Sequence, residues 1–271
     1  MRAKKTLVII LTALVFLSCI ALGFSAVFRV ESVQVDCVTI SDEAKTEVQD
    51  LQKLLTDAYK RESTFTVKEE RAREIVDGFA YFRFVSFQKA YPNRIVVEVV
   101  EDSEVYAVAN ADGGYYILNA EGTVLGIRDD YVNRSDATGT QYNVLLSGFT
   151  ATGVKGESLV GDGNFPYLLS ICQKADETLG GIRRNVVSAE IQGGASPETV
   201  VFKLSMREGV NIYLRNPTQA LLERTQAVIS YYLSKDGNGL TDQQRTRGSL
   251  VVYLGADGIK CVYSAQDIPN E

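Results

Sequence analysis

The chain has 271 residues, of which 45% are apolar and 23% are charged, and this profile is typical of a globular protein and excludes a disordered one. Its formal net charge of −6 argues against broad binding to nucleic acid, because phosphate recognition depends on clustered Lys and Arg. The absence of His removes the commonest general base and the commonest metal ligand.

An apolar, uncharged stretch at residues 6–28 follows a short basic tail at 1–5. At 1.5 Å per residue the stretch spans about 34 Å, enough to cross a bilayer core of about 30 Å. Arg2, Lys4 and Lys5 lie on its N-terminal side. The positive-inside rule therefore favours a cytoplasmic N-terminus and an extracytoplasmic C-terminus. We expect a single-pass transmembrane helix in the cell membrane.

Two other readings of this stretch are a cleaved signal peptide and a lipoprotein cut before Cys19. A signal peptide has an apolar region of about 7–15 residues and a small-x-small cleavage site, whereas this run is longer and 24–26 matches such a site poorly. Apolar residues also continue well past Cys19. The uncleaved helix is therefore preferred.

Residues 29–101 show the pattern of a small α+β domain. Apolar and polar residues alternate from 28 to 36, which indicates a half-buried strand. Thr39 and Ser41 can cap a first helix, whose apolar stripe is Val48, Leu51, Leu55 and Ala58. A capping box at 66–69 predicts a second helix, and strands are expected near 84–87 and 95–100.

The order β-α-α-β-β behind an N-terminal apolar helix resembles the POTRA domain of the FtsQ/DivIB family of bacterial cell-division proteins. The family's aromatic-Pro-Asn turn followed by an alternating strand is matched at 91–101, Tyr-Pro-Asn-Arg-Ile-Val-Val-Glu-Val-Val-Glu. The family usually continues with Arg and Pro-Val-Ala, whereas this chain has Asp102 and then Glu104-Val105-Tyr106-Ala107.

Residues 102–265 read mainly as antiparallel strands, and a tail occupies 266–271. Three hairpins are expected, each with a turn that ends in an acidic residue and Gly. They join 114–118 to 123–127, 200–205 to 210–214 and 250–254 to 259–263. Helical spacing at 164–179 predicts one helix, and Asn216-Pro217 is expected to open another.

This second region resembles the β domain that follows POTRA in the FtsQ/DivIB family. The segment 116–122 is similar to the family's aromatic-x-Leu-Ile-Asp-x-x-Gly stretch, and 143–148 is similar to its Leu-Pro-x-Leu-x-Gly segment without the proline. The resemblance covers 6 to about 265. It implies an α+β fold with one N-terminal transmembrane helix, a POTRA domain and a β domain.

No catalytic, cofactor-binding or metal-binding motif is present, so we expect neither an enzyme nor a cofactor. Asp129-Asp130 and Glu69-Glu70 could in principle form a glycosidase pair, but adjacent acids are far more often solvated. Cys37, Cys172 and Cys261 are read as buried thiols, with a Cys172–Cys261 disulfide as the alternative.

The resemblance implies a non-enzymatic scaffold of the divisome, located at the septum, that regulates septum assembly. Its implied partners are small coiled-coil division proteins of the FtsB/DivIC and FtsL kind, together with other membrane proteins of the divisome. Open sheet edges bind such partners by strand addition, and the last hairpin is the best candidate. The expected contacts are Val251, Tyr253, Lys260, Val262 and Tyr263. Alternatives are a POTRA-type polypeptide-transport protein and a surface-attached wall- or solute-binding protein.

Overall fold

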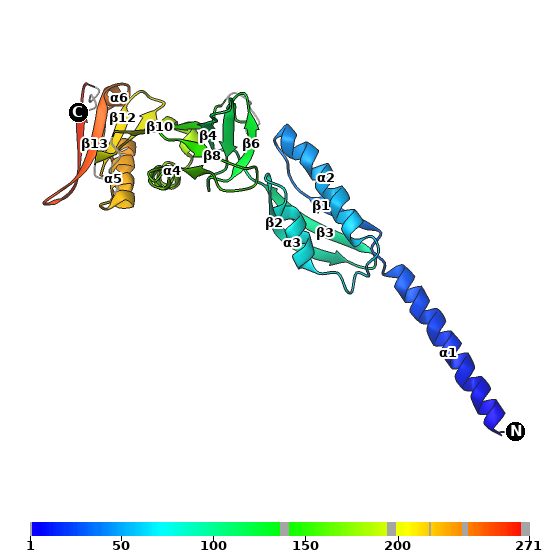
Figure 1. Ribbon diagram of the computed structural model, residues 1–271. Helices are drawn as coiled ribbons and strands as arrows, with labels where there is room; N and C mark the ends of the chain where they lie inside the picture. The colour runs from blue at the N-terminus through cyan, green and yellow to red at the C-terminus, as the bar shows by residue number, and fades with distance from the viewer. Residues whose placement is uncertain (1, 136–140, 194–198, 217, 235–237, 267–271) are drawn as a thin grey trace. The chain divides into compact units, whose positions relative to one another are not determined.

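The structure is a computed structural model that describes residues 2–135, 141–193, 199–216, 218–234 and 238–266 (Figure 1). The chain divides into two compact units, Met1–Asp102 and Ser103–Glu271. Within the described residues the structure is a mixture of helices and sheets. Most of the tail expected at 266–271 lies outside the described residues.

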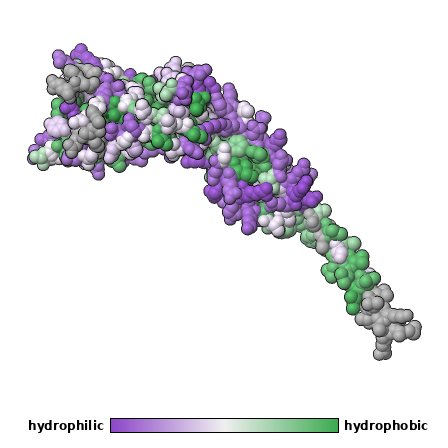
Figure 2. Space-filling view, viewed as in Figure 1, coloured by the Kyte–Doolittle hydropathy of each residue, from purple (hydrophilic) through white to green (hydrophobic). Residues whose placement is uncertain are grey.

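The first helix, α1 (Arg2–Val27), coincides with the predicted transmembrane segment, and that prediction is wrong. A crossing needs about 20 consecutive apolar residues. The side chains of α1 are described without a break only over 10–20, and no helix of the described chain is both long and apolar enough to cross a bilayer. The described side chains of α1 are largely hydrophobic and exposed (Figure 2). The same finding contradicts the predicted single-pass location in the cell membrane.

The rest of the first unit follows the order β-α-α-β-β that the sequence indicates. The β3 strand lies between the other two, parallel to β1 and antiparallel to β2. Ile95, Val97 and Val99 of β3 are buried, whereas Glu98 and Val100 are exposed, so the helices cover one face of the sheet. The elements are β1 (Ser32–Asp36), α2 (Asp42–Tyr59), α3 (Glu69–Asp77), β2 (Phe82–Ala90) and β3 (Arg94–Glu101).

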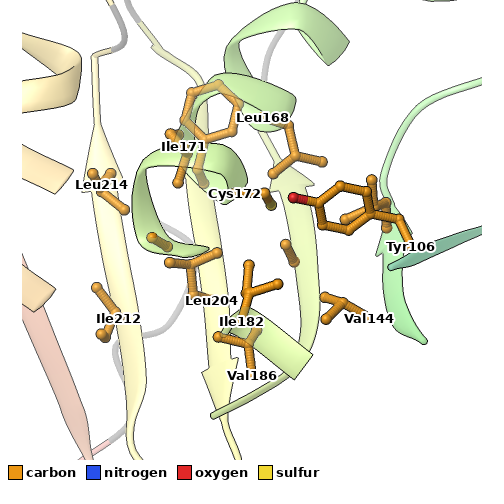
Figure 3. Packing of buried hydrophobic residues seen from close by; sticks show 14 of the residues in the cluster. Tyr106, Val144, Leu168, Ile171, Cys172, Ile182, Val186, Leu204, Ile212 and Leu214 are labelled. Carbon is orange, nitrogen blue, oxygen red and sulfur yellow. The ribbon is translucent and has the colours of Figure 1, made fainter. Parts of the chain in front are cut away.

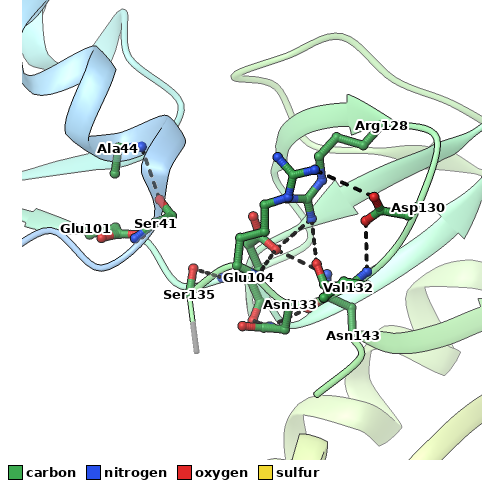
Figure 4. Close-up of polar contacts among 11 residues, drawn as sticks. Ser41, Ala44, Glu101, Glu104, Arg128, Asp130, Val132, Asn133, Ser135 and Asn143 are labelled. Carbon is green, nitrogen blue, oxygen red and sulfur yellow. Dashed lines mark hydrogen bonds and ion pairs between the residues drawn. The ribbon is translucent and has the colours of Figure 1, made fainter. Parts of the chain in front are cut away.

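The start of α2 is fixed by a cap and a carboxylate. The Ser41 hydroxyl accepts a hydrogen bond from the Ala44 N–H at 3.1 Å, as its position in the sequence predicts. The Glu101 carboxylate accepts the Ile40 N–H at 2.6 Å and the Ser41 N–H at 3.3 Å. Figure 4 shows Glu101 beside Ser41. The predicted capping box of α3 is wrong, because Thr66 donates its hydroxyl hydrogen to the Ser63 carbonyl and does not cap the helix.

The second unit is built on one nine-stranded sheet in the order β14-β13-β12-β11-β10-β7-β4-β5-β6. Its described strands are β4 (Tyr106–Ala109), β5 (Tyr115–Leu118), β6 (Val124–Arg128), β7 (Val144–Ser147), β10 (Val186–Gln192), β11 (Val201–Met206), β12 (Asn211–Arg215), β13 (Ser249–Gly255) and β14 (Gly258–Ser264). A separate pair is β8 (Ala151–Thr152) and β9 (Val160–Gly161). The helical segments are α4 (Phe165–Leu179), η1 (Ile182–Arg184), α5 (Leu221–Leu233) and α6 (Asp242–Arg245).

The three predicted hairpins are present as β5–β6, β11–β12 and β13–β14. Gly122, Gly209 and Gly258 in their turns have φ of 87°, 116° and 114°, the region that favours glycine. The sheet is nevertheless mixed, because β4–β7, β7–β10 and β12–β13 pair in parallel. These parallel pairs join the hairpins into one sheet.

The core of this unit lies between the sheet and α4 and α5 (Figure 3). Leu168 and Ile171 of α4 pack with Leu204 and Ile212 of the sheet. Cys172 is buried there as a free thiol, and all four cysteines are free, so the alternative Cys172–Cys261 disulfide is absent. The predicted thiol burial holds for Cys172, while Cys37 and Cys261 are only partly buried.

The start of α5 differs from the prediction. The helix begins at Leu221, and Asn216 has a φ of 54° instead of a helical value. The Arg224 guanidinium, which is buried, donates hydrogen bonds to the carbonyls of Arg215 and Asn216. These bonds hold the chain outside the helix for a few residues after β12. The predicted first helical residue, Pro217, lies outside the described residues.

Candidate functional site

The two edges of the nine-stranded sheet differ in how far the described chain covers them. At β6, the Val124 N–H donates to the Glu157 carbonyl at 2.9 Å, and the Gly156 N–H donates to the Val124 carbonyl at 2.8 Å. The Leu159 N–H also donates to the Gly122 carbonyl at 2.9 Å. At β14, no strand of the described chain pairs with the outer side. The outer side of β14 is therefore open along the strand, whereas the β6 edge is covered at its first residue, Val124.

The register of the β13–β14 hairpin determines which backbone groups reach that open edge. A two-residue turn at 256–257 makes Gly255 and Gly258 the closing hydrogen-bonded pair. In an antiparallel pair, hydrogen-bonded and non-hydrogen-bonded positions alternate along the strand. The β14 residues whose N–H and C=O groups point outward are therefore Ile259, Cys261 and Tyr263.

Four of the five predicted contact residues share one face of the hairpin. Val251 is opposite Val262, and Tyr253 is opposite Lys260. This face points away from the core, and Tyr253 and Val262 are 42% and 48% exposed. The alternation along the strand puts Tyr263 on the other face, opposite buried Leu250.

The fifth residue, Tyr263, is therefore part of the structure of the hairpin. Its side chain packs against the core, and its hydroxyl donates to the Arg247 carbonyl at 3.1 Å. The structure brings Val251, Tyr253, Lys260 and Val262 together and separates Tyr263 from them by the thickness of the sheet. Only its backbone remains available at the open edge.

The same face of the sheet continues across the neighbouring strands as one row of paired residues, of which Tyr213 is buried. Glu190 of β10 is opposite Lys203 of β11, which is opposite Tyr213 of β12. Tyr213 is next to Val251, which leads to Val262 at the edge. The Lys203 ammonium lies 5.9 Å from the centre of the Tyr213 ring. The row runs from charged residues to an apolar end at β14.

The hairpin also extends beyond the strand beside it. β12 pairs with β13 only from Ser249 to Val252, so Tyr253 and Leu254 have no partner on that side among the described pairings. Leu254 is 45% exposed, and Figure 1 shows the hairpin projecting past the neighbouring strands. Leu254 is not among the contact residues that the sequence predicts, although its neighbour Tyr253 is.

The chemistry of the hairpin is that of a binding surface. Burial raises the pKa of the Cys261 thiol, so the thiol stays protonated at neutral pH and is a poor nucleophile. Lys260 forms an exposed ion pair with Asp257 at 3.3 Å. The arrangement offers outward backbone hydrogen-bonding groups beside exposed apolar side chains, and both features suit an extended polypeptide.

No protein-family model matches the chain, and no curated protein matches it.

Proposed function

We propose that the protein is a non-enzymatic scaffold that binds a polypeptide partner by strand addition to β14. Its partners are small coiled-coil division proteins of the FtsB/DivIC and FtsL kind, and binding them regulates assembly of the division machinery. The open outer edge of β14 is the observation that carries the proposal. The choice of partners rests on the resemblance to the FtsQ/DivIB family.

The strand-addition mechanism is supported by the groups that converge at this edge. The outward backbone groups of Ile259, Cys261 and Tyr263 offer a ladder of hydrogen bonds, each worth about 0.5–1.5 kcal/mol net. Such bonds are largely independent of sequence, so specificity must come from side chains. Tyr253 and Val262 supply exposed apolar contacts next to the ladder, and Lys260 supplies a positive charge.

The β2 edge of the three-stranded sheet in the first unit is a less favourable site for strand addition than β14. This strand, one of the two edge strands of that sheet, contains a register shift between Phe84 and Ser86, which makes Val85 a bulge. The same strand carries Arg83 and Lys89. Bulges and charged side chains are devices that protect an edge from pairing. These features favour β14 over β2 and favour a scaffold over a polypeptide-guiding protein.

A proline at position 261 tests the proposal. Proline lacks the N–H that faces outward at this position, and edge strands tolerate it when that N–H makes no bond inside the sheet. Cys261→Pro should weaken binding of the purified coiled-coil partner from the same cell by about tenfold or more, since one ladder bond is lost and the ring obstructs the incoming strand. Titration calorimetry measures the dissociation constant.

The matched control is Cys261→Ser, which keeps the backbone N–H and should bind as the unchanged protein does. Circular dichroism and thermal unfolding establish that both variants fold. Equal binding by the two folded variants would show that the partner does not add a strand at β14. A partner that fails to bind even the unchanged protein would rule out the proposed partner class.

A further inference from the structure

Three tyrosines that are distant in the sequence form a cluster of neighbouring, mutually tilted rings at the other end of the second unit. The ring centres of Tyr115 and Tyr131 are 4.9 Å apart, and those of Tyr131 and Tyr142 are 5.2 Å apart. Tyr142 is 50% exposed, and the other two are partly exposed. We call these three residues the tyrosine platform. It belongs to the β6 end of the sheet and shares no residue with the β14 edge.

The platform rests on a segment that is held in place by backbone hydrogen bonds. Tyr131 and Tyr142 lie on two antiparallel stretches, in which the Asn143 N–H donates to the Tyr131 carbonyl at 3.0 Å. The Asn133 N–H donates to the Gln141 carbonyl at 2.8 Å, and Val132 forms a bridge with Tyr142. The two tyrosines therefore have a defined spacing before any ligand arrives.

A buried polar network fixes this segment to the sheet (Figure 4). The Glu104 carboxylate is fully buried and pairs with the Arg128 guanidinium at 2.8 Å. The Asn133 side-chain amide donates to the Glu104 carbonyl at 2.7 Å, and the Arg134 N–H donates to the Glu104 carboxylate at 3.0 Å. A rigid aromatic surface loses little conformational entropy when it binds, which favours affinity.

The charge around the platform is negative. Asp129 and Asp130 are exposed and directly precede Tyr131, and exposed Asp112 lies in the turn before Tyr115. Gly114, with a φ of 74°, brings that turn against the backbone at Arg128 and Asp129. The Arg128 charge is neutralised by buried Glu104.

Arg134, which is exposed, lies 3.6 Å from Asp130. Aromatic faces bordered by carboxylates are complementary to guanidinium groups, which stack on the rings and donate hydrogen bonds to the acids. We propose that the tyrosine platform binds an arginine-bearing segment of a polypeptide. This site is independent of the strand-addition site on β14.

The test uses the whole chain and a short synthetic peptide of alternating Arg and Gly, with binding followed by titration calorimetry at low and at physiological salt. Tyr142→Ala should weaken binding by about tenfold, because one stacking face is lost. Tyr142→Phe keeps the ring and should bind as the unchanged protein does. The double variant Asp129→Asn, Asp130→Asn should also weaken binding and reduce its dependence on salt.

Two further measurements show whether the peptide binds at the tyrosine platform instead of at β14, and whether binding depends on more than charge. Tyr253→Ala, an exposed tyrosine on the hairpin, should leave the affinity unchanged, as should Cys261→Pro. A matching Lys-Gly peptide should bind about threefold or more weakly, since ammonium groups do not stack as guanidinium groups do. Equal affinity for the Lys-Gly peptide, no binding of the Arg-Gly peptide, or an unaffected Tyr142→Ala variant would each overturn the proposal.

Discussion

At the β6 end of the nine-stranded sheet the chain covers the start of the edge strand, whereas at the β14 end no strand of the described chain pairs with the outer side of the hairpin. The β6 end adds a buried network around Glu104, in which a charge pair and side-chain amides are removed from water. The β14 end has its charged groups, Lys260 and Asp257, on the surface. Removing one partner of a buried polar group lowers stability strongly, because the group is left without a hydrogen bond away from water. Removing a partner of an exposed group has little effect, because water replaces it. The two ends should therefore respond differently to substitution.

The largest expected effect is at Glu104. Glu104→Ala leaves the Arg128 charge buried without its carboxylate and should lower the free energy of unfolding by about 3–5 kcal/mol. The matched change at the open end is Asp257→Ala, which breaks an exposed ion pair and should cost less than about 1 kcal/mol. Urea unfolding measures both. A loss of less than 1 kcal/mol in Glu104→Ala would mean that the network does not hold the β6 end together.

Two glycines with nearly the same positive φ, one after β7 and one beside β6, test how closely the backbone segments approach each other. Gly148 and Gly156 have φ of 86° and 87°, but a Cβ at Gly148 would collide with the Ile191 carbonyl, and one at Gly156 would meet open space. Gly156→Ala should lower the free energy of unfolding by about 1 kcal/mol, because alanine is strained at a positive φ. Gly148→Ala should lower the free energy of unfolding by about 2 kcal/mol more, because its Cβ would push β7 away from Ile191 of β10. Thermal unfolding of the two variants checks the difference, and equal losses would contradict the close approach.

At the open end, substitutions should alter binding more than stability. Val262→Asp places a charge on the exposed face beside the edge and should weaken binding of the coiled-coil partner about tenfold, or roughly 1.4 kcal/mol. Its stability should change by less than about 1 kcal/mol. The control is Val160→Asp, an exposed valine in the β8–β9 pair that should affect neither property. Equal binding by Val262→Asp and Val160→Asp would show that the exposed face of the hairpin around Val262 is not part of the binding site.

Replacing either of two buried tyrosines by phenylalanine should change stability by smaller amounts, and in opposite directions. The Tyr106 hydroxyl is buried without a hydrogen-bond partner among the described groups, so Tyr106→Phe should be neutral or stabilising by up to about 1 kcal/mol. The Tyr59 hydroxyl donates to the Lys68 carbonyl at 2.6 Å, so Tyr59→Phe should destabilise by about 1 kcal/mol. Denaturant unfolding compares them, and a clear loss in Tyr106→Phe would indicate a partner for its hydroxyl.

Tyr59 also predicts a dependence on alkaline pH. Burial raises the pKa of Tyr59 to about 12, whereas an unfolded tyrosine titrates near 10. Between these values the unfolded state binds fewer protons than the folded state, so stability falls as pH rises. Tyr59→Phe should make this fall less steep between about pH 10 and 12. An unchanged slope would show that the Tyr59 hydroxyl titrates normally.

The parts of the fold that the sequence predicts are those that depend on local chemistry. Gly122, Gly209 and Gly258 mark the hairpin turns because positive φ is nearly specific to glycine. Ser41 marks the start of α2 for a similar local reason. The cap predicted at Thr66 fails because this hydroxyl bonds to the Ser63 carbonyl instead. Local signals therefore locate elements well and their ends less well.

The errors arise where distant residues decide the structure. Asn216 has the features of a helix cap, but Arg224 holds its carbonyl, so α5 begins later. The parallel pairing of β7 with β10 joins segments with a whole helix between them, and no local pattern encodes it. The transmembrane prediction relied on apolar length over 6–28, which the described part of α1 does not bear out.

The candidate site was predictable in part. Period-two alternation within a hairpin of known register puts Val251, Tyr253, Lys260 and Val262 on one face, and the structure agrees. Tyr263 lies on the opposite face because it directly follows Val262, and neighbouring side chains of a strand alternate between the two faces. The tyrosine platform could not be foreseen, since Tyr115, Tyr131 and Tyr142 are distant in the sequence and come together only through the pairing of β5 with β6 and of 131–133 with 141–143.

Amide hydrogen exchange on β14, with and without the coiled-coil partner, tests the central claim most directly. The outward N–H groups of Ile259, Cys261 and Tyr263 should exchange fast in the free protein and become strongly protected when the partner is bound. The N–H groups of Lys260 and Val262, which face β13, should be protected in both states. Unchanged exchange at all three outward positions, with the partner demonstrably bound, would contradict strand addition at β14.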